Sequence, residues 1–142
     1  MRPQDCAQQI ARGAALNDGF RLYLVECDSF EATVEFSFVL DTAVQHDAVW
    51  VGPPIGLGAA LVGVVASLAE EFVPGRHPVV VVSLEAEDTH TFSLLNQQRE
   101  RFVRAIPYTV VLLGCHGFLE AFRKAAIDTW SIRSGGFTVG EE

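Results

Sequence analysis

Apolar residues recur along this chain in two alternating patterns, continuous runs and stripes with helical spacing. The stripes have apolar positions three or four residues apart, which is typical of helices that pack on a core. Strands that alternate with helices predict parallel pairing through right-handed crossovers. We therefore expect an α/β fold, a three-layer sandwich around a mainly parallel sheet of four or five strands. The predicted strands are FRLYLVECD (20–28), AVWV (48–51), HPVVVVSLE (77–85), TVVLLGC (109–115) and, as a last one, SGGFTV (134–139).

The segment 29–44, SFEATVEFSFVLDTAV, fits two periods. Phe30, Val34 and Phe38 share one face of a helix, while Val34, Phe36 and Phe38 alternate as they would in a strand. Asp28 followed three positions later by Glu31 has the spacing of a capping box, with Asp28 as the N-cap. The helix is the favoured interpretation, and the strand stays open.

Four further helices are predicted. Residues 3–16 form an amphipathic helix that ends at the turn NDG (17–19), and a second helix follows Gly56. The third covers residues 93–106 and is stopped by Pro107. The fourth covers residues 117–130. Their inward residues are expected to be Ile10 and Ala14 in the first, Leu57, Leu61, Val64, Val65, Leu68 and Phe72 in the second, Leu95, Phe102 and Ile106 in the third, and Phe118, Phe122, Ala126 and Trp130 in the fourth.

A length of 142 residues with 49% hydrophobic content suits one domain with a substantial core. We assign residues 1–19 to an N-terminal helix and turn and residues 20–139 to the α/β core. The net charge of −8 disfavours binding to nucleic acid or to an anionic membrane, because like charges repel. Residues 1–90 carry 13 acidic and 4 basic side chains, so they supply nearly all of the excess.

Residues 48–69 contain no charge and are long enough to span a membrane. Pro53 and Pro54, four glycines and acidic flanks argue against a spanning helix. The three cysteines have no CxxC spacing, and the N-terminus has no apolar run of signal-peptide length. We expect a cytoplasmic protein with no membrane partner.

The glycine-rich segment that follows residue 51 has the layout of a nucleotide-binding loop but lacks its chemistry. In the P-loop pattern GxxxxGK[ST], Leu57 stands where Gly52 would require the second glycine, and no Lys, Ser or Thr occurs from residue 52 to residue 66. The dinucleotide pattern GxGxxG fails because Leu61 replaces its third glycine. The turn after the first strand has no glycine or lysine and carries four acidic residues. No cofactor is therefore expected.

Polar residues gather at the predicted carboxyl ends of the strands, where open α/β sheets place their ligands. They are Cys27, Asp28, Glu85, Glu87, Asp88, His90, Cys115 and His116. Adjacent strand residues point to opposite faces, which disfavours Cys115 with His116 as nucleophile and base. The spacing of the strand-end Cys, His, Asp and Glu residues along the chain shows no paired-ligand motif, so no metal site is predicted. A small cytosolic hydrolase or a nucleotide-responsive enzyme that uses Glu85, Glu87, Asp88, His90 and Cys115 stays open as the alternative function.

Three segments together resemble a known family: LLNQQRE (94–100), YTVVLLG (108–114) and DTWSIRSGGF (128–137). The pattern is similar to the P-loop-type domain of bacterial signal-transduction NTPases, the STAND class, in the branch that has lost its nucleotide-binding motifs. The similarity covers about residues 20–139. Ile127 stands where the pattern has Pro, and Ile132 where it has an aromatic residue. The residues that match best are Asp128, Trp130, Ser131, Arg133, Ser134, Gly135 and Phe137.

The resemblance implies a P-loop-NTPase-like or Rossmann-like fold and a non-catalytic protein-interaction or assembly module of a bacterial signalling or defence system. A structural interpretation of the last segment stays open beside it, with Trp130 packed inward and Gly135 or Gly136 as a left-handed helix cap.

Association is expected through the helix after Gly56, whose residues 55–68 carry no charge. The partner would be a second copy, giving a homodimer, or another protein in a hetero-complex. The competing prediction is a monomer in which the helix of residues 3–16 covers this face. The predicted interaction residues are Trp50, Ala59, Val62, Gly63, Ala66, Trp130 and Arg133.

Overall fold

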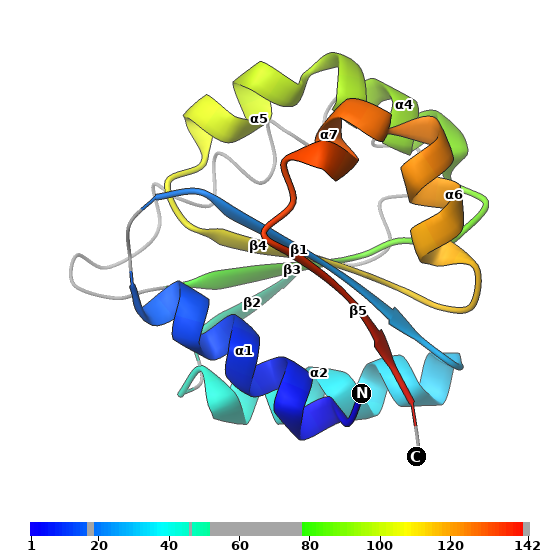
Figure 1. The fold of residues 1–142 in the computed structure, drawn as a ribbon. Coiled ribbons are helices and arrows are strands. Elements are labelled where there is room, and N and C mark those ends of the chain that lie inside the picture. Colours follow the sequence, from blue (N-terminus) through cyan, green and yellow to red (C-terminus); the bar gives the residue numbers. More distant parts are fainter. Residues whose placement is uncertain (17–18, 46, 52–77, 141–142) are drawn as a thin grey trace.

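The computed structural model describes residues 1–16, 19–45, 47–51 and 78–140. Its centre is a five-stranded sheet in the order β2-β3-β4-β1-β5, with every neighbouring pair parallel (Figure 1). The predicted parallel sheet is therefore confirmed, including its last strand at one edge. The strands are β1 (Arg21–Cys27), β2 (Ala48–Val51), β3 (Val79–Ser83), β4 (Thr109–Gly114) and β5 (Gly135–Val139).

Helices cover both faces of the sheet, as the three-layer prediction requires. Figure 1 shows α1 and α2 below the sheet and the other described helices above it. We call these the α1–α2 layer and the α4–α7 layer. Their members are α1 (Pro3–Ala15) and α2 (Phe30–Ala43) in the first, and α4 (Thr89–Gln97), α5 (Arg99–Ala105), α6 (Phe118–Ala125) and α7 (Ile127–Ser131) in the second.

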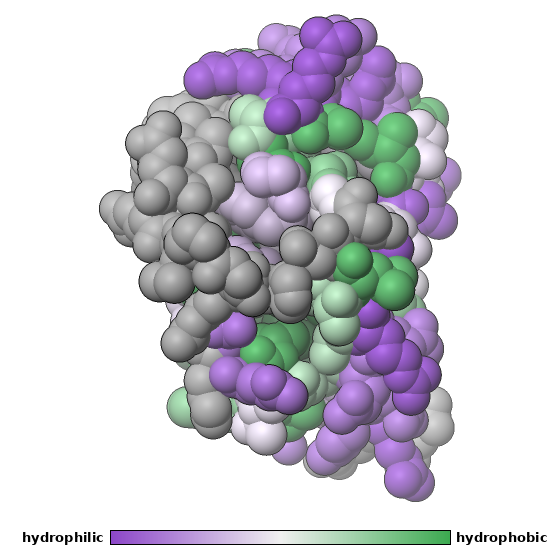
Figure 2. Space-filling view, turned by 90° about the vertical axis from the view of Figure 1, so that its left-hand side faces the viewer, coloured by the Kyte–Doolittle hydropathy of each residue, from purple (hydrophilic) through white to green (hydrophobic). Residues whose placement is uncertain are grey.

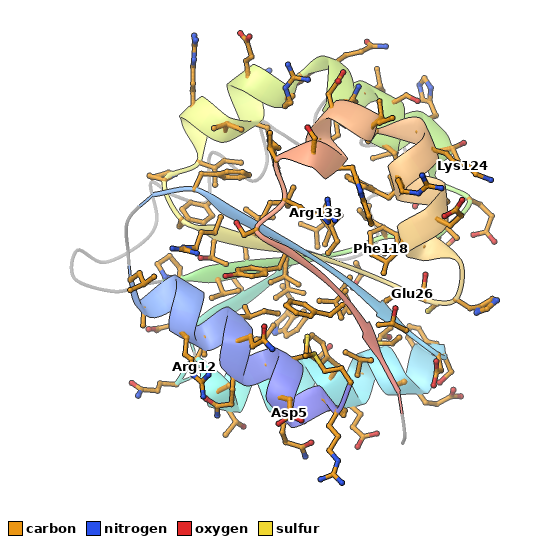
Figure 3. All side chains as sticks on the ribbon, in the orientation of Figure 1. Asp5, Arg12, Glu26, Phe118, Lys124 and Arg133 are labelled. Atoms are coloured by element: carbon orange, nitrogen blue, oxygen red, sulfur yellow. The ribbon has the colours of Figure 1, made fainter. Side chains whose placement is uncertain are left out.

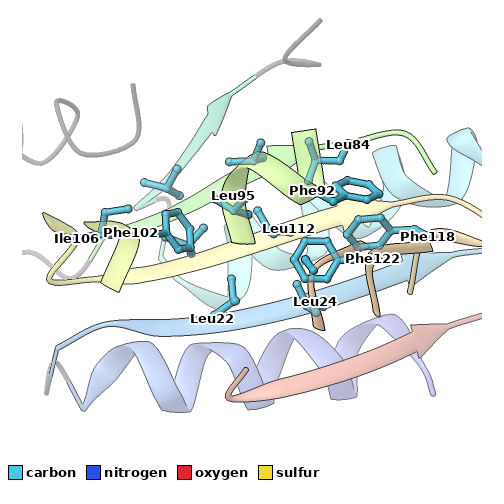
Figure 4. Packing of buried hydrophobic residues seen from close by; sticks show 14 of the residues in the cluster. Leu22, Leu24, Leu84, Phe92, Leu95, Phe102, Ile106, Leu112, Phe118 and Phe122 are labelled. Carbon is cyan, nitrogen blue, oxygen red and sulfur yellow. The ribbon is translucent and has the colours of Figure 1, made fainter. Parts of the chain in front are cut away.

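Alternation along the strands divides the core into two halves. In β1, Leu22 and Leu24 face the α4–α7 layer, whereas Tyr23 and Val25 face the α1–α2 layer. All six residues of β4 and the first four of β3 are buried, because both faces of these inner strands are covered. Figure 4 shows the half of the core between the sheet and the α4–α7 layer, in which phenylalanine rings from α4 and α6 pack together.

Most predicted core positions are confirmed within the described residues. The positions expected inward in the N-terminal helix, in residues 93–106 and in residues 117–130 are all buried except Trp130, which is half-buried against the same core. Pro107 does follow a helix end, with Ile106 in an extended conformation before it. The predicted helix after Gly56, with its inward residues, lies outside the described part of the chain.

Two predicted helices are each broken into two. The segment predicted as 93–106 starts earlier, at Thr89, and is divided at Gln98 into α4 and α5. The segment predicted as 117–130 is divided at Ala126, whose φ of −133° lies outside the helical region. Neither break falls at a glycine or a proline.

Segment 29–44 is a helix, so its strand alternative is wrong, but the capping prediction also fails. Ser29, and not Asp28, is the N-cap of α2, and its Oγ accepts a hydrogen bond from the Ala32 amide at 3.1 Å. The Asp28 carboxylate instead lies against Gly140, where a Cβ atom would come within 2.7 Å of its Oδ2. The Asp28 side chain therefore lies beside the end of β5, and Ser29 caps the helix.

Hydropathy follows the layers on the face that Figure 2 shows. Hydrophilic residues gather at the top and the bottom, over the helices, and hydrophobic ones lie mainly between them. Among the described residues, no helix has the length and apolar character needed to cross a membrane.

Candidate functional site

A cavity of about 320 Å³ opens at the carboxyl ends of β3 and β4, beside the first turn of α2. Apolar side chains make most of its wall, and acidic ones stand at the end of β3. This is the edge at which parallel sheets of this kind place their ligands. The lining residues are Phe30, Thr33, Ser83, Leu84, Glu85, Ala86, Glu87, Leu113, Gly114, Cys115 and His116.

Gly114 shapes the floor of this edge by letting α6 approach the sheet. A Cβ atom at Gly114 would lie 2.6 Å from Cβ of Phe118 and closer still to its ring. Phe118 is fully buried at the start of α6. A side chain at position 114 would therefore displace the aromatic core beneath the cavity.

Three carboxylates give the cavity a negative potential. Burial raises the pKa of the Cys115 thiol, and the charges of Glu85, Glu31 and Glu87 raise it further. These acids come from two different elements, α2 and the loop after β3, so the fold brings them together around one thiol. Such an environment favours a cationic guest and opposes an anionic one.

The same electrostatics disfavour a nucleophilic role for Cys115, because the thiolate is the reactive form and here it is destabilised. The argument from strand alternation against Cys115 and His116 does not hold, since β4 ends at Gly114 and both residues line the cavity from the turn that follows. His90 is exposed in the first turn of α4 and does not line the cavity. The enzyme alternative thus retains Glu85, Glu87 and Cys115 in one place, without an activated thiol.

The turn between β1 and α2 consists only of Asp28 and Ser29. The Ser29 hydroxyl accepts a hydrogen bond from the Ala32 amide, which satisfies one of the amides that the first turn of α2 leaves without a partner inside the helix. At the end of the same strand, β1, Glu26 accepts a hydrogen bond from the Leu119 amide at 2.9 Å and so places a carboxylate on the N-terminus of α6 (Figure 3). Helix N-termini are the usual anion sites of such folds, and here the chain supplies the anion itself.

Asp88, another predicted strand-end acid, has a local structural contact. Its Oδ2 accepts a hydrogen bond from the Glu85 amide at 3.1 Å, which closes the loop after β3. Cys27 is buried in the half of the core between the sheet and the α1–α2 layer. Within residues 1–16, 19–45, 47–51 and 78–140, no group of three His, Cys, Asp or Glu side chains has the arrangement that a metal ion needs.

Two of the segments that resemble the STAND class, 94–100 and 128–137, contact each other in the α4–α7 layer. The Asn96 Oδ1 atom accepts hydrogen bonds from the Thr129 amide at 2.9 Å and from its hydroxyl at 3.1 Å. Ala126 occupies the N-cap position of α7 and has no side chain that could do this, so Asn96 of α4 caps α7 in its place. Arg99 pairs with Asp128 at 3.3 Å. Two separated parts of the pattern therefore join α4 to α7.

The rest of the last segment carries the chain from α7 into β5. The Arg133 guanidinium lies 4.0 Å from the centroid of the Trp130 ring and donates to the Trp130 carbonyl at 2.8 Å. The Ser134 amide donates to the Leu22 carbonyl, and the Ser134 Oγ accepts from the Leu22 amide. These contacts fix the start of the edge strand.

Gly135 and Gly136 are residues of β5, so the predicted left-handed helix cap is wrong. Gly135 instead leaves room for the stacked rings of Tyr23 and Phe137, with which a Cβ atom would collide at 3.0 to 3.2 Å. The prediction that Trp130 packs inward is confirmed, since its side chain packs against the half of the core beneath the α4–α7 layer.

The predicted interaction residues do not form one described surface. Trp50 is exposed on β2, at one edge of the sheet, while Trp130 and Arg133 contact each other beside β5, at the opposite edge. Ala59, Val62, Gly63 and Ala66 lie outside the described residues. Their joint role as an interface remains a prediction.

An apolar stripe on α2 is the surface that the sequence interpretation missed. The structure buries Thr33, Phe36 and Leu40 of this helix and exposes Phe30, Val34 and Phe38. The signal was present in the sequence, because the helix offers two apolar faces and a sheet can cover only one of them. We call Phe30, Val34 and Phe38 the α2 stripe.

The comparisons with known proteins bear on the fold alone. No protein-family model matches the sequence, and no curated protein matches it either. The solved structure of the Aeropyrum pernix ORC2 protein, in its ADP form, is similar to this chain with a TM-score of 0.56 at 11% sequence identity. The similarity covers 94% of this chain and 47% of that protein, so this chain spans about half of its length. The fold is P-loop-NTPase-like, as the resemblance implied.

Proposed function

We propose that this chain is a non-catalytic protein-recognition or assembly module built on a P-loop-like fold that holds no nucleotide. Its place in the nucleotide-binding-deficient branch of the bacterial STAND class, in a signalling or defence system, is part of the same proposal. The support for that placement is the joining of LLNQQRE to DTWSIRSGGF through Asn96 and Arg99.

The observation that carries the proposal is the chemistry of the strand ends. A phosphate group needs a cradle of backbone amides and positive charge, whereas the β1–α2 turn consists only of Asp28 and Ser29, and α2 contains no Lys or Arg. The Ser29 hydroxyl already accepts a hydrogen bond from the Ala32 amide. The Glu26 carboxylate occupies the N-terminus of α6, and Glu85 and Glu87 line the cavity. A nucleoside triphosphate placed here would meet the carboxylates of Glu85 and Glu87 and no lysine among the lining residues. The ADP of the ORC2 structure belongs to that protein.

Nucleotide binding provides the direct test. Isothermal titration calorimetry with ATP, ADP and GTP in the presence of Mg²⁺ should give no heat of binding at micromolar concentration. A millimolar excess of nucleotide should also leave the Tm unchanged, because a ligand that binds only the folded state raises it. A micromolar Kd for any of the three would overturn the proposal.

A second candidate, a small hydrolase or nucleotide-responsive enzyme, is favoured by the convergence of Glu85, Glu87 and Cys115 on one cavity. Turnover of a substrate panel that disappears in both Glu87→Gln and Cys115→Ser, while the thermal melt stays unchanged, would support it. The raised pKa of the Cys115 thiol counts against it.

A further inference from the structure

The α2 stripe is an apolar row on an otherwise polar helix surface. Phe30 and Phe38 are each 71% exposed and Val34 is 40% exposed, although large apolar side chains are usually buried. The three are spaced four residues apart, so they lie in line along one side of the helix. The opposite side of α2 packs on the core through Phe36 and Leu40. Contiguous exposed apolar groups of this kind mark sites of protein binding.

Acidic residues accompany the stripe, and basic ones are missing from the helix. The sequence of α2 contains Glu31, Glu35 and Asp41 and no Lys or Arg. The chain as a whole carries a net charge of −8. Two copies that met through this face would bring acidic residues together, which is repulsive. A partner with basic residues beside its apolar ones is complementary in both respects.

The stripe runs into the cavity at the ends of β3 and β4. Phe30 is the first residue of the stripe and also lines the cavity, together with Thr33 from the next turn of α2. The cavity has apolar walls from Leu84 and Leu113 and carboxylates from Glu85 and Glu87. A Lys or Arg side chain matches this combination, because its aliphatic stem packs on apolar surface while its cationic head reaches a carboxylate.

We propose that the α2 stripe and the adjoining cavity form a docking site for a basic amphipathic helix of a partner protein. The apolar positions of that helix pack on Phe30, Val34 and Phe38, and one of its Lys or Arg side chains enters the cavity toward Glu85 and Glu87. This inference rests on the proposed protein-recognition function and names the partner chemistry. A helix laid into an apolar groove with i, i+3 and i+4 anchors is a common mode of recognition.

The test measures binding of the full chain to a fluorescein-labelled model helix of Leu and Lys by fluorescence anisotropy. The peptide has Leu at the i, i+3, i+4 and i+7 positions. We expect saturable binding that weakens as salt is raised, and none to the same peptide with every Lys replaced by Glu. The Phe30→Ser/Phe38→Ser double variant should bind about tenfold more weakly or worse, since such anchors dominate helix docking. The matched control, Leu16→Ser/Ile127→Ser, removes two apolar side chains of similar exposure elsewhere and should bind like the parent chain.

The charges are tested separately. Glu85→Gln/Glu87→Gln should weaken binding several-fold and reduce its salt dependence, whereas Glu100→Gln/Glu120→Gln on the other layer should leave both unchanged. Equal binding by the parent chain and the Phe30→Ser/Phe38→Ser variant would overturn the proposal as nonspecific charge attraction.

Light scattering separates a second copy from a partner helix. A dimer that becomes a monomer in the Phe30→Ser/Phe38→Ser variant would assign the stripe to self-association and overturn the proposed partner, while a monomeric parent chain is the result expected. None of these outcomes changes the calorimetric result for nucleotides, so failure of this inference and failure of the proposed function are distinguishable.

Discussion

The two helical layers of this fold use their large side chains differently. In the α4–α7 layer, Phe92, Phe118 and Phe122 are fully buried, with ring centroids 5.2 to 5.8 Å apart. In the α1–α2 layer, the buried surface of α1 consists mainly of small residues and Ile10, while Phe30 and Phe38 of α2 point outward. The phenylalanine rings of α4 and α6 are therefore in the core, whereas two of the three phenylalanines of α2 are exposed.

The residues that carry the sequence resemblance and the residues of the proposed binding surface lie in different layers. The matched pattern of Asn96, Asp128 and Trp130 lies in the α4–α7 layer, where its side chains cap a helix and pack on the core. The α2 stripe belongs to no recognised pattern. The residues of this pattern thus contribute to the capping and packing of the α4–α7 layer, and the residues proposed to bind a partner lie on the opposite face of the sheet.

The largest expected difference between the layers is in the cost of removing a phenylalanine. Phe122→Ala should lower the free energy of unfolding by about 3–5 kcal/mol, because a fully buried ring is lost and a cavity remains. Phe38→Ala should change it by only about 0.5 kcal/mol or less, because most of that side chain is already in water. Urea unfolding followed by circular dichroism measures both. A loss of several kcal/mol in Phe38→Ala would mean that the chain itself covers the stripe.

Removing a helix cap should give a smaller difference in the free energy of unfolding between the two layers. Asn96→Ala should destabilise the protein by about 1–2 kcal/mol, since it removes two hydrogen bonds to the buried Thr129 and leaves α7 without a cap. Ser29→Ala removes one bond to the Ala32 amide at the more exposed start of α2 and should cost about 1 kcal/mol or less. Urea midpoints at constant m-value give the two numbers. A larger effect for Ser29→Ala would place the more important cap in the α1–α2 layer and reverse the comparison.

Local patterns predicted the sheet because they depend only on neighbouring residues. Continuous β-branched runs such as VVVV at the start of β3 are stable only when buried on both faces, and that requirement fixes the layers. The burial of Phe118, Phe122 and Ala126 followed from helical spacing in the same way, even though the helix itself breaks at the last of them.

Features that depend on distant contacts were not predictable from the sequence. Asp28 is not the N-cap of α2, and its carboxylate lies against Gly140, which is more than a hundred residues away. The capping of α7 by Asn96 depends on the break at Ala126, and the outward direction of Phe38 depends on which face of α2 the sheet covers. Strand-end acids could be placed at one edge from the sequence, but the part that Phe30 plays in the cavity could not.

The smallest expected effect concerns the reactivity of the cysteine thiols, all three of which lie in or beside the α1–α2 layer. Burial is the main cause that raises the pKa of Cys6 and of Cys27 to about 12. The charges of Asp28 and Glu26 raise the pKa of Cys27 further, whereas the N-terminal amino group lowers that of Cys6. At pH 8 the native protein should therefore react with iodoacetamide first at Cys115, the least buried of the three, and more slowly than a free cysteine, because a raised pKa leaves less thiolate.

Removing the neighbouring charges tests the electrostatic part of that prediction. Glu85→Gln/Glu87→Gln should speed the alkylation of Cys115 at pH 8, since two carboxylates that raise its pKa become neutral, whereas Glu100→Gln on the other layer should not change the rate. Mass spectrometry of timed samples locates and quantifies each adduct. An unchanged rate in the double variant would show that burial alone governs this thiol, and the cavity would then lack the negative potential that the proposed entry of a Lys or Arg side chain requires.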